Sequence, residues 1–367
     1  MAFSTIDSPK KYFEAKTYTG TGSTQSITGL SFSPDFVWTK TRSTTFAHGL
    51  WDSVRGATKK LSSNSTDAEV TESGLTAFNS DGFTLGSDAG ANQNTGSYIS
   101  WNWDANGAGS SNTQGTITST VSANTTSGFS IVTRTGTGSV GTVGHGLSAV
   151  PSMIITKKRS AVDNWGVYHK SLGATKYLCL NLTDASGTSS SPFNNTEPTS
   201  SVFTVGTGST WNASSATFVD YCFAEVKGFS RFGSYTGNGS ADGTFVYTGF
   251  TPAFIMFKLT TTIAEGLKNW LIFDNKRDTT NANSAILQPN VSSAEATSDF
   301  LDFTSNGFKL RTTDGAINYS GATYIYMAFA ENPFCTSKGI PVTARWFGLY
   351  RSEEHTSELQ SLRHLVC

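Results

Sequence analysis

The chain has 367 residues, of which 14% are charged, and a formal net charge of -1 at pH 7. This balance offers no basic surface for phosphate contacts, so nucleic acid is excluded as an expected partner. The longest apolar run, 253–257, is far too short to cross a bilayer, and Met1 to Asp7 carry no signal-peptide pattern, so we expect a soluble protein made in the cytoplasm, not at a membrane.

The first repeat, residues 1–104, is predicted to consist of short β-strands. Aromatic residues make up 12% of the chain and stand, with β-branched ones, between Gly, Asn and Ser turns. Five landmarks occur in order: a glycine-rich turn, a strand running from a proline to a lysine, a short apolar strand, a hairpin, and an asparagine ahead of an aromatic strand. They span 18–23, 34–40, 50–52, 80–85 and 92–98.

Residues 105–127 follow the first repeat and are rich in Gly, Ser, Thr and Asn. This composition is typical of a flexible linker. The opening prolines agree with that assignment, since Pro34 and Pro151 are 117 residues apart but Pro151 and Pro252 only 101. We therefore predict a linker that lengthens the first step between repeats.

The five landmarks return twice in the same order, in residues 128–230 and 231–345. They span 134–139, 151–157, 167–169, 200–205 and 212–218, then 235–240, 252–258, 272–274, 305–310 and 318–324. Self-similarity at a long period indicates a repeat protein. The sequence thus predicts an all-β fold of three tandem antiparallel β-sandwich domains of jelly-roll-like type.

Four ring-bearing residues gather around one aligned strand of the repeats: Trp51, Trp165, Trp270 and His48. Two interpretations are open for them. If the rings are exposed, they are ligand-binding residues that stack on sugar rings; if they are buried, they belong to the core, which is the commoner fate of such side chains.

Charged residues also recur at repeat positions. Asp52 precedes Arg55 as Asp274 precedes Arg277, while the second repeat has His169 at the aspartate position. Such a pair either polarises a substrate or fixes a turn, and we expect the turn. Carboxylates that end the last strand of each repeat do not form the one unique acid–base pair of a glycosidase, so we predict no catalytic residues and no enzyme. They are Asp104, Glu225 and Glu331.

No cofactor or metal is predicted. The glycine pattern at 136–141 has no helix after it, so we expect a turn there and not a dinucleotide site. The histidines are scattered and lack zinc-ligand spacing. Cys179, Cys222, Cys335 and Cys367 show no paired spacing, and the first two are expected to be buried thiols.

The last residues, 351–367, resemble the translation of a common sequencing-library adapter. Codons of that adapter give the string from Arg351 to Ser361, and an index with its flanking bases gives Leu362 to Cys367. The alternative is an amphipathic helix, since Leu359, Leu362 and Val366 lie at helical spacing. We expect an artefact, with the natural end between Arg345 and Tyr350.

Five strings of the sequence carry a resemblance to a known family. They are Phe3 to Pro9 with Tyr12 and Phe13, the turn 18–22, the segment 117–133, the strand 324–334 and the stretch 339–345. With these strings the chain resembles a repeat domain of unknown function that occurs in structural, tail-appendage proteins of marine tailed bacteriophages. Arg134 departs from that pattern, which has an aromatic there, and we expect weaker packing of its turn.

The resemblance implies a place on a virion assembled in the host cytoplasm, in a tail fibre or similar appendage, with other virion proteins as partners. We expect a structural protein that adsorbs to a host surface glycan or protein. The alternatives are a tailspike-like glycan depolymerase and a spacer without a ligand. A homotrimer is one expected assembly, because fibre proteins are often trimeric, although tandem repeats also supply several sites within one chain.

Overall fold

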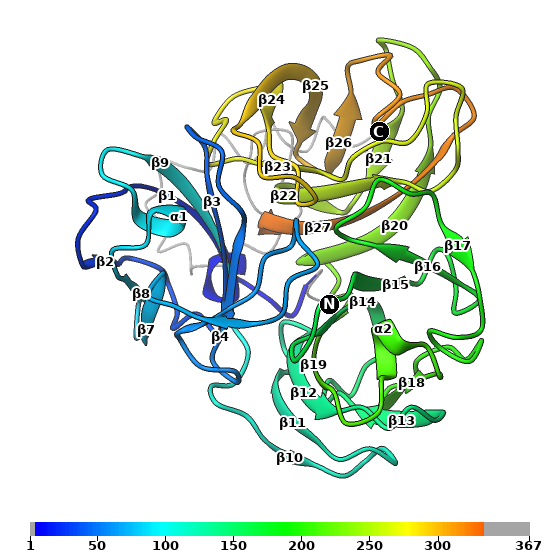
Figure 1. Ribbon diagram of the computed structural model, residues 1–367. Coiled ribbons are helices and arrows are strands. Elements are labelled where there is room, and N and C mark those ends of the chain that lie inside the picture. Colours follow the sequence, from blue (N-terminus) through cyan, green and yellow to red (C-terminus); the bar gives the residue numbers. More distant parts are fainter. Residues whose placement is uncertain (1–3, 334–367) are drawn as a thin grey trace, which may run out of the picture.

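The computed structural model describes residues 4–333 and confirms the predicted all-β class, with ladders between its named strands that are antiparallel. Three units stand around a common centre: the first unit (4–104, blue to cyan), the second unit (105–229, teal to green) and the third unit (230–333, lime to orange) (Figure 1). None of the helices in residues 4–333 is long and apolar enough to span a membrane.

The first unit pairs β1-β9-β3-β4 in an inner sheet and β2-β8-β7 in an outer sheet, with a small β5-β6 ladder beside them. Its elements are η1 (Pro9–Lys11), β1 (Phe13–Thr19), β2 (Gln25–Ile27), β3 (Phe36–Thr41), β4 (Gly49–Asp52), β5 (Lys59–Lys60), β6 (Val70–Thr71), β7 (Leu75–Asn79), β8 (Gly82–Leu85), α1 (Ala89–Asn92) and β9 (Ser97–Trp103).

The second unit has an inner sheet in the order β10-β11-β12-β19-β14-β15-β16-β17 and an outer pair β13-β18. Its elements are β10 (Ser110–Asn112), β11 (Ser119–Asn124), β12 (Phe129–Thr135), β13 (Gly141–Gly144), β14 (Pro151–Lys158), β15 (Trp165–His169), β16 (Lys176–Cys179), β17 (Gly187–Thr188), β18 (Val202–Val205), α2 (Ser209–Asn212) and β19 (Thr217–Ala224).

The prediction of a flexible linker at 105–127 is therefore wrong. Strand β11 pairs with β12 over its whole length, and Ile117 forms a parallel bridge with Val143 on the outer pair. Apolar side chains of this segment, Ile117 and Val121, enter the core of the second unit. Polar composition concealed the strands because Ser, Thr and Asn occupy the positions between these buried side chains.

The third unit repeats the plan, with inner sheet β20-β27-β22-β23 and outer sheet β21-β26-β25-β24. Its strands are β20 (Ser230–Thr236), β21 (Phe245–Tyr247), β22 (Phe250–Leu259), β23 (Leu271–Asp274), β24 (Asn283–Ile286), β25 (Ala296–Thr304), β26 (Gly307–Leu310) and β27 (Thr323–Pro333). Residues 334–367, including the predicted natural end and the adapter-like string, lie outside the described residues.

One buried asparagine per unit holds the glycine-rich turn that begins each repeat. In the first unit Asn92 accepts a hydrogen bond from the Thr21 amide at 2.8 Å and donates to the Ser23 carbonyl at 2.6 Å. Asn212 and Asn318 make the corresponding bonds in the other units. The turn is thus specified by a buried amide that satisfies backbone groups, and the glycine pattern at 136–141 belongs to it.

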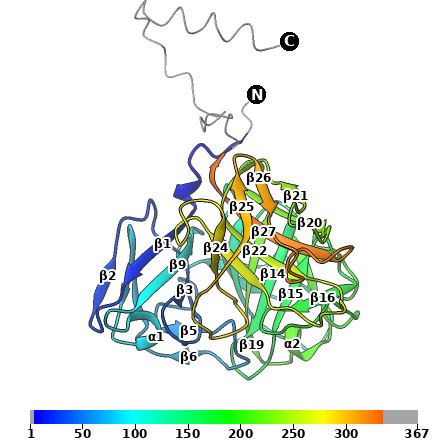
Figure 2. The ribbon, with the colours of Figure 1, turned by 90° about the horizontal axis from the view of Figure 1, so that it is seen from above.

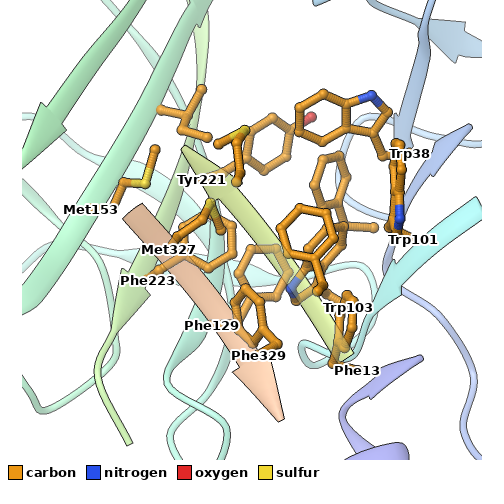
Figure 3. Close-up of a cluster of buried hydrophobic side chains, with 14 of the residues drawn as sticks. Phe13, Trp38, Trp101, Trp103, Phe129, Met153, Tyr221, Phe223, Met327 and Phe329 are labelled. Carbon is orange, nitrogen blue, oxygen red and sulfur yellow. The ribbon is translucent and has the colours of Figure 1, made fainter. Parts of the chain in front are cut away.

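Each unit has its own core between its two sheets, but the inner sheets share a second one. We call this shared cluster the central core; it takes side chains from all three units. Figure 3 shows its aromatic rings and methionines converging from separate strands. Members labelled there are Phe13, Trp38, Trp101, Trp103, Phe129, Met153, Tyr221, Phe223, Met327 and Phe329.

A triangle of rings marks the middle of the central core. Trp103, Phe223 and Phe329 occupy the same position on β9, β19 and β27, five residues after the aromatic that opens each landmark strand. Their ring centroids are 5.7–6.3 Å apart in each pairing. Because equivalent residues of three units meet at one point, the units are related by an approximate three-fold axis. Figure 2 shows the three units from a second direction.

This arrangement changes what the repeats are physically. About ten large apolar side chains per unit lie in the central core, and at about 1.5–3 kcal/mol each their burial is worth on the order of 20 kcal/mol per unit. Separating a unit would expose that surface. The three repeats are therefore expected to unfold as one cooperative unit and not as independent domains.

Candidate functional site

Three of the four rings singled out in the sequence occupy one equivalent position and join the units. The Trp165 Nε1–H donates to the Ser62 carbonyl of the first unit at 2.9 Å, and the Trp270 Nε1–H donates to the Cys179 carbonyl of the second unit at 3.0 Å. His48 completes the ring of contacts through Nε2, 3.0 Å from the Gln288 carbonyl of the third unit.

The tautomer of His48 follows from its partners. Its Nδ1 accepts a hydrogen bond from the Trp38 indole at 2.9 Å, so Nε2 carries the proton and donates to Gln288. Burial, with the nearby Lys40 charge, lowers the pKa of His48 to about 3. The side chain is therefore a neutral structural donor near pH 7.

Burial also decides against the ligand-binding interpretation of these residues. Trp51, Trp165 and His48 are fully buried and Trp270 is 1% exposed. Trp51 faces the outer core of the first unit instead of a junction. The assignment of these four side chains as ligand-binding residues is therefore wrong, and the alternative that they belong to the core is confirmed.

The recurring Asp–Arg pairs fix turns, as expected: Asp52 accepts from the Arg55 amide at 2.8 Å, and Asp274 accepts from the Arg277 amide at 2.9 Å. The same pairs also lie at junctions between units. Arg55 donates to Asp52, and the Tyr221 hydroxyl of the second unit donates to the same carboxylate at 2.8 Å. Arg55 also reaches Glu69, which binds Arg159 of the second unit through both carboxylate oxygens. Every charge in this network has a partner, as burial demands.

The junction between the third and first units repeats this network. Arg277 donates to Asp274 at 2.6 Å, and the Trp101 indole of the first unit donates to Asp274 at 3.0 Å. Arg277 also bonds to Glu295, which Arg42 of the first unit holds with two hydrogen bonds. These carboxylates are occupied by protein donors, so they are structural.

The junction between the second and third units has a neutral residue at the aspartate position, whereas Arg231 pairs with Glu225 at 2.7 Å and Lys258 donates to the Thr183 carbonyl elsewhere in the same junction. His169 donates from Nε2 to the Tyr326 carbonyl at 3.2 Å, because its Nδ1 accepts from the Ser171 amide. The position that supplies Tyr221 and Trp101 elsewhere is Met327 here, and a thioether has no proton to donate.

Arg134 replaces the tyrosine of the other units without loosening its turn, contrary to our expectation. The Tyr18 hydroxyl donates to the Ala91 carbonyl at 2.8 Å, and Arg134 donates to the equivalent Trp211 carbonyl at the same distance. Its guanidinium also pairs with Asp220 and lies 4.6 Å from the Phe218 ring centroid. The ring stacking of the other units becomes a cation–π contact.

A pocket on the second unit is the best candidate for a ligand site; we call it the second-unit pocket. It has a volume of about 410 Å³ and lies beside β16, β17 and α2. Its lining includes Asn164, Tyr177, Cys179, Asp184, Thr210 and Trp211. This size falls in the range of small-molecule sites.

Two aromatic rings shape the second-unit pocket. Tyr177 and Trp211 meet edge to face with centroids 5.1 Å apart. Glycines allow this packing: a Cβ on Gly187 would come within 2.7 Å of the Tyr177 ring, and one on Gly166 within 2.2 Å of the Trp211 indole. Any larger residue at either position would displace a ring.

The polar wall of the second-unit pocket is held in place by further hydrogen bonds. The Thr210 hydroxyl donates to Asp163 at 2.6 Å, and the Asn164 side-chain oxygen accepts from Asn181 at 2.8 Å. The Asp184 side chain is exposed at the rim. The partly exposed Tyr177 ring, backed by the buried Trp211 indole, lies beside amide, hydroxyl and carboxylate groups. This combination is suited to a sugar, which offers apolar C–H faces and hydroxyl edges.

Other chemistry at the pocket is limited by what lines it. Burial, with Asp184 and Asp163 nearby, raises the pKa of the Cys179 thiol to about 12, so the reactive thiolate is scarce. Across residues 4–333, no three His, Cys, Asp or Glu side chains gather closely enough to hold a metal ion.

Sequence reasoning missed Tyr177 and Trp211 because they are not landmarks of the repeat. One signal was present: Trp211 stands directly before the landmark Asn212, where the other units have Ala91 and Ile317. A single large ring at a position that is otherwise aliphatic marks a local specialisation of one unit.

Comparison with known families gives one match of long extent. Residues 8–333 match the model described as a domain of unknown function, DUF7483. No curated protein matches the chain. The family model covers all three units together, in agreement with the shared central core.

Proposed function

The chain belongs to the DUF7483 family, and from this premise we propose that it is a structural appendage protein of a tailed-phage virion that adsorbs to a host surface glycan. The observation that supports a glycan as the ligand is the second-unit pocket, in which Tyr177 and Trp211 lie beside fixed polar groups. The virion assignment is supported by the sequence strings that resemble phage appendage repeats, and other virion proteins are the proposed partners.

Binding without hydrolysis is the version that the pocket supports. Glycosidases of the common type use two carboxyl groups about 5–10 Å apart. Among the described residues that line the second-unit pocket, Asp184 is the one carboxylate. The nearby Asp163 is already bound by Lys158 and Thr210, so a depolymerase would need a second acid from elsewhere, such as another copy in a homotrimer.

The first experiment measures binding of fluorescently labelled full-length chain to a panel of marine bacteria by flow cytometry, before and after surface polysaccharide is stripped. We expect saturable binding that is lost on stripping. Binding that survives stripping would point to a protein receptor, and absence of binding to every strain would favour the spacer alternative.

Two variants locate the binding site. Tyr177→Ala and Asp184→Asn should each weaken adsorption by about tenfold, as for central contacts in other interfaces. The matched control is Tyr247→Ala, which removes an aromatic side chain 51% exposed on the third unit and away from the pocket. Equal binding by all three variants would remove the pocket from the proposal.

A further inference from the structure

The third unit has a pocket at the position equivalent to the second-unit pocket; we call it the third-unit pocket. The two pockets correspond residue by residue: Asn164 with Asn269, Tyr177 with Ile286, and Thr210 with Ala316, as the shared landmarks and the ladders align them. Two units with different sequences thus have a pocket at the same position of the fold, which indicates that the fold itself leaves this position unfilled.

The lining of the third-unit pocket differs in chemistry and size. Its volume is about 260 Å³, against about 410 Å³ in the second unit. The tyrosine has become Ile286 and the threonine Ala316, and Phe300 adds a further apolar wall. Leu267 stands at the rim with 45% of its surface exposed. A smaller and more apolar group fits here.

Polar groups around the third-unit pocket indicate a neutral ligand. Lys268 is already paired with Glu265 at 3.1 Å, and the Asp314 carboxylate accepts a hydrogen bond from the Ala316 amide at 2.7 Å, so both charged groups of the lining have partners within the protein. The Asn269 side-chain oxygen is occupied by Asn290, at 2.7 Å, which leaves the Asn269 amide as a neutral donor on the lining.

We propose that the third-unit pocket binds the acetamido group of an N-acetylated hexosamine. The methyl group would pack against Ile286, Phe300 and Ala316, while the acetamido oxygen accepts from the Asn269 amide. The pocket itself is independent of the proposed function, but the choice of a saccharide as ligand rests on it.

The consequence is a chain with two unlike sugar sites on one rigid body. Because the units share the central core, the distance between the pockets is fixed. A polysaccharide that presents both kinds of residue at that spacing would gain by avidity, whereas a polymer with one kind would engage a single pocket.

The test uses chitotriose as the probe and cellotriose, which has no acetamido groups, as the comparison. Binding of each to the full chain is measured by saturation-transfer NMR and by titration. Chitotriose should bind the wild type, and Leu267→Asp should weaken it by about tenfold. Ala316→Leu, which fills the pocket, should do the same, with thermal unfolding followed to verify that both variants fold. Tyr247→Ala, which removes an exposed aromatic side chain outside both pockets, is the matched control and should leave chitotriose binding unchanged. Tyr177→Ala is measured beside it to test the second-unit pocket.

The outcomes separate this inference from the proposed function. Loss of chitotriose binding in Tyr177→Ala, with none in Leu267→Asp, would assign the ligand to the second-unit pocket and overturn the inference. Glycan adsorption that depends on Tyr177 without any chitotriose binding would also overturn it, while leaving the proposed function intact. Absence of both would remove both proposals.

Discussion

The buried contact at the aspartate position is ionic between the first and second units and uncharged between the second and third units, although the same positions of the repeat form both. We call these the ionic junction and the neutral junction after that buried contact; the Arg231–Glu225 pair of the second lies nearer the surface. Asp52 and Arg55 at the first correspond to His169 and Leu172 at the second. Glu69 and Arg159 likewise correspond to Ser186 and Thr260, which keep the backbone hydrogen bond but not the ion pair.

The difference follows from one side chain on the facing strand. A buried aspartate needs several donors, and Tyr221 supplies one to Asp52 as Trp101 does to Asp274. Met327 supplies none, and there the aspartate and its arginine are both absent. Ionic networks are therefore present where the neighbour completes them, which fits the cost of an incomplete buried pair.

The largest expected effect comes from breaking the ionic junction. Asp52→Ala leaves Arg55 charged and buried without its main partner, so the free energy of unfolding should fall by about 3–5 kcal/mol. The matched change at the neutral junction, Leu172→Ala, should cost about 1–2 kcal/mol, since Leu172 is only partly buried. Urea denaturation of the two variants measures both; equal losses would contradict the comparison.

The buried contact of His169 at the neutral junction should respond to mild acid. Burial lowers the pKa of His169 to about 4, below its usual value near 6.5. Between those values the unfolded chain binds the proton and the folded chain does not, so stability is lost as pH falls from 6.5 towards 4. His169→Gln removes this contribution.

The measurement is the free energy of unfolding of wild type and His169→Gln at pH 6.5 and 4.5. The wild type should lose about 2 kcal/mol more than the variant. Asp104 contributes the opposite slope, because burial and Asp35 raise its pKa to about 7, but it is common to both proteins and cancels. Parallel curves for the two proteins would show that His169 does not titrate in this range.

A smaller effect should come from the ring contacts that every junction shares. Trp165→Phe keeps most of the buried ring but leaves the Ser62 carbonyl without its donor, at a cost of about 1–2 kcal/mol. Trp270→Phe should cost a similar amount through the Cys179 carbonyl. Thermal unfolding measures both; a cost at one junction alone would show that the ring contact is not equivalent.

The sequence predicted the strands, the three-fold repetition and the positions that recur, because these depend on local pattern and on self-similarity. It did not predict which units touch. Tyr221 reaches Asp52 across 169 positions of the chain, and only the packing of inner sheets into the central core sets that contact. The repeats looked like separate domains for the same reason.

The candidate site was predicted less well than the fold. Aligned aromatic residues drew attention to Trp165 and Trp270, but positions kept in every unit serve the junctions that every unit makes. Tyr177 and Trp211 differ from their counterparts, and a ligand site in one unit needs such differences. In this chain the shared residues therefore form the architecture, and the site that we propose for a ligand uses two residues that depart from the repeat.

The smallest expected effect belongs to a double variant that replaces the buried ion pair of the second unit with the neutral side chains that another unit has at the same positions. Arg134 and Asp220 of the second unit stand where the first unit has Tyr18 and Ser100. Arg134→Tyr alone should cost about 3 kcal/mol or more, because Asp220 remains buried and loses its partner. Arg134→Tyr with Asp220→Ser should stay within about 1 kcal/mol of wild type, since the tyrosine hydroxyl can donate to the Trp211 carbonyl as Tyr18 does to Ala91.

Urea denaturation of the two single variants and the double variant gives the coupling energy between the sites. Additive costs would mean that the two solutions are not interchangeable, and that the choice between ionic and neutral contacts depends on more of the unit than the pair itself.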